Sequence, residues 1–141
     1  MRLVILAVGK LRDPWVSEAC AEYTTRLRGR LNVELIEVKR DEDVMPRLPP
    51  RHAVWVLDER GQQPTSRELS TRLNRVRHSG GLGIVCCIGG ADGHSDALRA
   101  RADYLVSLSR LTLPHRLARV VLLEQLYRAT TILAGEPYHR D

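Results

Sequence analysis

The clearest indication of the fold class lies in the segment Leu82-Gly-Ile-Val-Cys-Cys-Ile-Gly-Gly-Ala-Asp-Gly93. Its first seven residues are almost all apolar and predict a strand that is buried on both faces, as in parallel sheets. Three glycines follow within five residues, and Ser95 then predicts the start of a short helix. A strand, a glycine loop and a helix in this order are typical of ligand-binding α/β proteins.

The rest of the chain repeats the alternation of strand and helix. Apolar runs predict strands at residues 3–8, 32–38, 53–57, 82–88 and 104–108. Amphipathic patterns predict helices at residues 14–28 and 114–134, one that starts at residue 65 and ends at Gly80, and a short one after Ser95. The proline-containing segment between residues 39 and 52 predicts a loop or one short helical turn. This order indicates one α/β domain of residues 1–141 with a parallel sheet and no linker or repeat.

The amino-acid composition indicates which kinds of protein and of site are compatible with this chain. The chain is 43% hydrophobic and 28% charged, which is typical of a globular domain. Its net charge of +5 is compatible with binding to a nucleic-acid backbone, but many basic proteins of this size bind no nucleic acid. Cys86 and Cys87 lie inside a predicted strand with side chains on opposite faces, and no histidine stands at ligand spacing, so we expect neither disulfides nor a metal. No apolar run is long enough for a secretion signal or a membrane span, which favours a soluble cytoplasmic protein.

A ligand pocket is expected at the carboxyl ends of the strands, where the loops that start at Leu57, Gly89 and Ser109 should converge. The glycine loop alone is weak evidence, because it is not GxGxxG and glycine-rich turns are common. The segment 109–115 could hydrogen-bond an adenine through its backbone while its leucines cover the ring. Alternatively, Thr112 is simply the N-cap of the helix that Pro114 begins.

Two further groups of residues allow a functional or a purely structural interpretation. Glu124, Tyr127 and Arg128 share one helical face, for which an exposed ion pair is the favoured interpretation. The tail residues 138–140 combine a stacking ring, an imidazole and a guanidinium, which suits RNA, although chain ends are often only solvated.

Taken together, four motifs resemble the bacterial ribosomal RNA pseudouridine N3-methyltransferase family of the SPOUT class. They are Ile88-Gly-Gly-Ala-Asp-Gly93, Leu108-Ser-Arg-Leu-Thr-Leu-Pro-His115, Glu124-Gln-Leu-Tyr-Arg-Ala129 and Pro137-Tyr-His-Arg140. The opening Leu6-Ala-Val-Gly-Lys10 and Trp15 are also similar to this family, so the resemblance covers nearly the whole chain.

The resemblance implies an α/β parallel-sheet fold with a C-terminal trefoil knot, which the general rule against knots would exclude. It also implies a homodimer that binds S-adenosylmethionine (S-adenosyl-L-methionine), uses no metal, and methylates N3 of a pseudouridine in 23S rRNA within the assembled ribosome.

The same resemblance assigns roles to individual residues. The expected cofactor-binding residues are Leu57, Gly89, Gly90, Ser109, Arg110, Leu111, Thr112, Leu113 and Pro114. Tyr138, His139 and Arg140 would face the RNA from the partner subunit. From the chemistry of an imide nitrogen, we expect Arg140 to stabilise the N3 anion and His139 to accept the proton, directly or through water.

Two features depart from the family pattern. Ala91 and Asp92 stand where the glycine loop usually carries proline and glutamate, which should loosen the loop and weaken cofactor binding, and the segment around residues 40–50 is short. The Ala91-Asp92 departure leaves a noncatalytic ribosome-binding module as one alternative. The other is a related SPOUT enzyme that acts on transfer RNA, which would normally need a separate RNA-binding extension.

Overall fold

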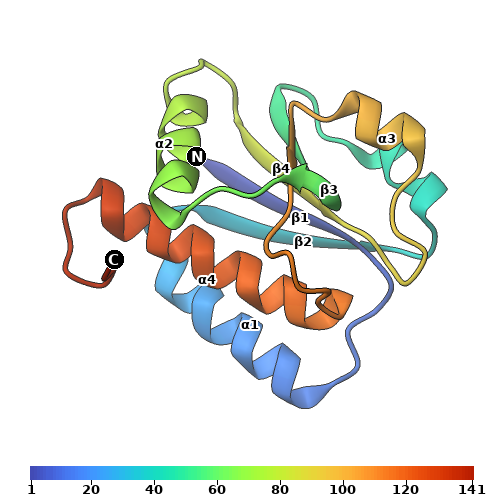
Figure 1. The fold of residues 1–141 in the computed structure, drawn as a ribbon, viewed down its shortest axis with the longest axis horizontal. Coiled ribbons are helices and arrows are strands. Elements are labelled where there is room, and N and C mark those ends of the chain that lie inside the picture. Colours follow the sequence, from blue (N-terminus) through green and yellow to red (C-terminus); the bar gives the residue numbers. More distant parts are fainter.

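The computed structural model describes residues 1–141 and shows a five-stranded sheet with helices on both faces (Figure 1). The strand order is β2-β1-β4-β3-β5, and every neighbouring pair is parallel. The strands are β1 (Arg2–Val8), β2 (Asn32–Val38), β3 (His52–Gln62), β4 (Gly83–Ile88) and β5 (Tyr104–Val106). The helices are α1 (Pro14–Leu27), α2 (Ser66–Arg77), α3 (Asp96–Arg101) and α4 (His115–Leu133). The predicted parallel α/β sheet is confirmed.

Several predictions for individual elements were wrong. Strand β5 ends at Val106 and not at residue 108. Strand β3 does not stop at Leu57: after a shift of register it continues to Gln62, whose carbonyl accepts a hydrogen bond from the Ser107 amide at 2.7 Å. The segment between β2 and β3 contains two 3₁₀ turns instead of at most one, η1 (Asp41–Asp43) and η2 (Met45–Arg47).

The sheet separates two apolar cores. Helices α1, α2 and α4 cover one face, and α3 with the two 3₁₀ turns covers the other (Figure 1). The alternation of side chains along each strand divides the apolar residues between the two cores. Cys86 packs in the core beneath α1, α2 and α4, whereas Cys87 packs on the opposite face with Leu98 of α3, as the strand pattern predicted.

Local capping signals explain the start of α2 but not the start of α1. Thr65 and Glu68 form the predicted capping box at the start of α2, with both reciprocal hydrogen bonds present. Asp13 occupies the N-cap position of α1, yet its side chain makes no capping hydrogen bond. None of the helices has the length and apolar character needed to cross a membrane.

Candidate active site

A cavity of about 650 Å³ opens at the carboxyl ends of β3, β4 and β5. Most of its lining comes from residues 57–60 in the second half of β3 and from residues 88–94 and 106–115, which begin at the last residues of β4 and β5. The three segments that were predicted to converge on one pocket therefore do so, although the one that starts at Leu57 is part of β3 and not a loop. The volume falls within the range of roughly 300–1,000 Å³ that is typical of small-molecule sites.

The glycine loop forms one wall of this cavity. The Gly93 amide donates to the Gly90 carbonyl at 3.1 Å and so closes a tight turn. Gly93 has a φ of +71°, which other residues rarely adopt, and a Cβ atom on Gly89 would lie 3.2 Å from the Gly93 carbonyl carbon. The turn therefore depends on glycines, and it presents backbone rather than side chains to a ligand.

The end of the glycine loop is held by a buried pair, which we call the Asp41–His94 clamp. The His94 side chain is only 1% exposed, and its Nδ1 lies 2.6 Å from Oδ1 of Asp41 in η1. The other oxygen of Asp41 accepts a hydrogen bond from the Ser95 amide at 2.7 Å. Sequence reasoning missed this contact, because the two residues are 53 positions apart and share no local pattern.

Arg99 of α3 connects the glycine loop to β3. Its guanidinium lies 3.2 Å from Asp58, whose side chain is 7% exposed, and it also donates to the His94 carbonyl and to Asp96. The hydrogen bond from Arg99 lowers the pKa of Asp96. Asp58 and Arg99 both line the cavity, so these contacts fix two of its walls relative to each other.

The segment before α4 forms the third wall. The Ser109 side chain accepts a hydrogen bond from the Leu111 amide at 2.9 Å, and Leu111 itself is 76% exposed beside the cavity. The N-cap of α4 is Pro114, which has no capping side chain, so the interpretation of Thr112 as the N-cap was wrong. All the residues expected to bind the cofactor line this cavity except Arg110, which is exposed outside it.

The tail residues lie in a different place. Tyr138 donates to Glu124 at 2.7 Å, and His139 Nδ1 accepts from Arg128 at 3.1 Å. Glu124 and Arg128 also pair at 2.8 Å with side chains only 18% and 23% exposed, so this is not the exposed ion pair that was expected. Burial and the hydrogen bond to Glu124 raise the pKa of Tyr138 to about 12. We call these four residues the tail cluster.

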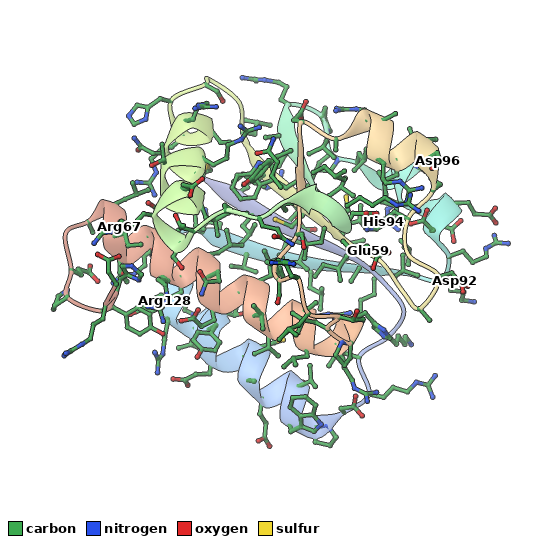
Figure 2. All side chains as sticks on the ribbon, viewed as in Figure 1. Glu59, Arg67, Asp92, His94, Asp96 and Arg128 are labelled. Atoms are coloured by element: carbon green, nitrogen blue, oxygen red, sulfur yellow. The ribbon has the colours of Figure 1, made fainter.

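The tail cluster and the cavity occupy opposite ends of α4. Figure 2 shows Arg67 and Arg128 at one end of the molecule and Glu59, Asp92 and His94 at the other. The cavity is lined by the first turn of α4, whereas the tail follows its last turn, and a helix of 19 residues is about 28 Å long. One subunit therefore does not bring His139 and Arg140 together with the cavity residues.

Comparison with known proteins places the chain in a family. Residues 1–139 match the family model described as "Predicted SPOUT methyltransferase". The ribosomal RNA large subunit methyltransferase H of Pelobacter propionicus is 44% identical over 152 residues, a match that covers 99% of both chains. The chain belongs to this SPOUT methyltransferase family. The enzyme of the same name from Geobacter metallireducens is 43% identical, with 100% of both chains covered.

Solved SPOUT structures share the fold of this SPOUT methyltransferase. A probable methyltransferase from Bordetella pertussis superposes with a TM-score of 0.63 at 12% identity, covering 92% of this chain and 94% of that one. The SpoU methyltransferase AviRb from Streptomyces viridochromogenes, in complex with AdoMet, gives 0.53 at 15% identity, covering 95% of this chain and 58% of that one. Membership of the class implies the C-terminal trefoil knot.

The chain is thus an S-adenosylmethionine-dependent methyltransferase, and its cavity fits that cofactor. The glycine turn leaves a wall without side chains, and Leu57, Leu111 and Leu113 add apolar surface for an adenosine. Ser107 and Ser109 supply hydroxyls and backbone groups beside these leucines. A lining that combines this apolar surface with polar groups suits a nucleoside.

Proposed function

We propose that this methyltransferase modifies N3 of a pseudouridine in 23S ribosomal RNA, acting on the assembled ribosome in the cytoplasm. The observation that carries the proposal is the full-length similarity to relatives that are named ribosomal RNA large subunit methyltransferase H. The net charge of +5 agrees with an RNA substrate.

The cavity residues would hold the cofactor mainly through backbone and apolar contacts. Gly89 and Gly90 would provide close backbone approach, and residues 109–114 would enclose the adenine. S-adenosylmethionine supplies a methyl group that its sulfonium already activates. The main task of the protein is then to hold the target nitrogen in line with that methyl group and to exclude water.

The tail would supply the groups that act on the base. An imide nitrogen must lose its proton before it attacks, and a nearby cation stabilises the resulting anion. Arg140 is exposed and pairs with no other side chain in the subunit, so its guanidinium is available for this role. His139 would accept the proton at Nδ1 after exchanging its contact with Arg128 for the substrate. Tyr138 would contact the RNA beside them.

These roles require a homodimer in which each tail serves the cavity of its partner. Within one subunit the tail and the cavity are separated by the length of α4. A second copy that packs antiparallel against α1 and α4 would place its tail beside this cavity. The exposed Trp15 at the start of α1 is a large apolar side chain that such a partner would cover.

Complementation between inactive variants tests the trans arrangement. Arg140→Ala removes the tail function, and Ser109→Trp blocks the cofactor cavity. If tails act in trans, a mixture refolded at equal concentrations recovers about a quarter of wild-type activity, because half of the dimers are mixed and each has one intact site. No recovery in a mixture that demonstrably forms mixed dimers would show that each tail serves its own subunit.

The substrate is tested with labelled S-adenosylmethionine. Ribosomes that lack the modification should become labelled in their large-subunit RNA, whereas purified transfer RNA should not. Label in transfer RNA alone would favour the related SPOUT activity. Calorimetry that detects no S-adenosylmethionine binding would favour a noncatalytic ribosome-binding module.

A further inference from the structure

A second cavity of about 200 Å³ lies between the start of α1 and the start of α4. Its walls come from residues 10–13, ahead of α1, and from His115, Arg116 and Arg119 on α4. His115 also lines the cofactor cavity, so the two cavities are adjacent. We call this second cavity the basic cleft. It has room for a group several times larger than one water, which occupies roughly 30 Å³ in the liquid.

Positive charge dominates the basic cleft. Lys10 and Arg12 are exposed and have no ion-pair or hydrogen-bond partner in the structure. Arg116 lies 3.6 Å from Asp13, with both side chains well exposed, which is a weak pair. The cleft therefore has more cations than the nearby carboxylates neutralise.

Two helix N-termini add to this positive field. Helices α1 and α4 both begin at the cleft, at the same end of the molecule (Figure 1). Neither has a side-chain cap or an acidic residue in its first turn, and α4 instead begins with His115 and Arg116. Cations at a helix N-terminus are unfavourable against the helix dipole, whereas a bound anion at that position is stabilised by it.

Arg119 provides an independent indication of a ligand. This residue is 3% exposed, and its Nη1 atom pairs with Glu37 at 2.9 Å. Its Nε atom is buried and has no hydrogen-bond partner. Buried polar groups in proteins are nearly always paired, so a guanidinium that lines a cavity with an unused donor indicates a missing acceptor.

We propose that the basic cleft binds a backbone phosphate of the RNA, next to the nucleotide that enters the cofactor cavity. The proposal rests on the proposed function, because it takes RNA as the substrate. Phosphate oxygens match guanidinium groups and helix N-termini in charge and in hydrogen-bond geometry. A phosphate held beside the cofactor cavity would fix the register of the RNA relative to the methyl group. A second candidate anion is the carboxylate of S-adenosylmethionine, which the experiment distinguishes.

The test compares two double variants that remove the same charge. Lys10→Gln with Arg12→Gln alters the cleft without breaking a contact in the fold, since neither side chain has a partner. Arg75→Gln with Arg77→Gln removes two exposed, unpaired cations from α2 and serves as the control. The KM for unmodified ribosomes is measured at saturating S-adenosylmethionine and at several salt concentrations, and cofactor affinity is measured by calorimetry.

We expect the cleft variant to raise the KM for ribosomes about tenfold and to reduce the slope of log KM against log salt by about one, relative to the control. Its affinity for S-adenosylmethionine should be unchanged. Equal KM values for the two variants would overturn the proposal, and weaker cofactor binding by the cleft variant would assign the cleft to the cofactor carboxylate. Sedimentation with ribosomes measures the binding of the same proteins without requiring methyl transfer. A protein that binds ribosomes through the cleft but transfers no methyl group would therefore contradict the proposed function and not the cleft.

Discussion

Replacing Asp41 by alanine removes the carboxylate that holds the end of the glycine loop. His94 is 1% exposed, so its Nδ1–H would lose its acceptor where water has little access. An unpaired buried donor costs about 1–3 kcal/mol, and the lost bond to the Ser95 amide adds about 1 kcal/mol. Because the Asp41 side chain is 21% exposed, water replaces part of this loss, and we expect a net destabilisation of about 2–3 kcal/mol.

This destabilisation should be visible in thermal unfolding. A chain of 141 residues has an unfolding entropy of about 0.3 kcal/mol/K, so Tm should fall by about 7–10 °C. Asp43→Ala is the matched control, because Asp43 lies in the same turn but only approaches the exposed Arg40 at 3.6 Å, and its loss should cost less than about 0.5 kcal/mol. Circular dichroism gives both Tm values, and calorimetry should show weaker S-adenosylmethionine binding by Asp41→Ala. Equal Tm values for Asp41→Ala and Asp43→Ala would show that the Asp41–His94 clamp does not stabilise the fold.

Three further predictions concern the tail and the cysteines. Arg140→Ala should lower kcat at saturating S-adenosylmethionine about a hundredfold and leave cofactor affinity unchanged, and full turnover would remove Arg140 from the chemistry. Hydrogen bonds from Arg67 and His139 lower the pKa of Asp141 to about 2, so these contacts are complete above about pH 4 and are lost as the pH falls toward 2. Arg67→Ala should raise this pKa toward 3.8 in an NMR titration, and an unchanged pKa would show that the ion pair is absent in solution. Burial raises the pKa of Cys87 to about 12, so in the native protein at pH 8 a thiol reagent should modify Cys20 well before Cys87, and equal rates would contradict this burial.

Local signals in the sequence were sufficient for most of the fold. Strand β2 matches its predicted range of residues 32–38, and the capping box at Thr65 marks the start of α2 correctly. The continuation of β3 to Gln62 could not be predicted, because polar residues form it and a pairing with the end of β5 holds it in place. Backbone pairing between distant segments leaves no periodic pattern in either of them.

The site was predictable only in part, for the same reason. Parallel strands bring their carboxyl ends to one edge, so the convergence of the three segments followed from the prediction of a parallel sheet. The Asp41–His94 clamp and the basic cleft join residues that are far apart in the chain. The exposure of the Glu124–Arg128 ion pair was predicted wrongly, because Tyr138, which follows the end of the helix, covers this pair.

The most direct test of the proposed function is the identity of the methylated nucleoside. The purified protein is incubated with labelled S-adenosylmethionine and with ribosomes from a strain that lacks the modification, and the RNA is digested and analysed by mass spectrometry. We expect the label to appear as N3-methylpseudouridine in large-subunit RNA. Label in any other nucleoside, or none from a protein that binds the cofactor, would contradict it.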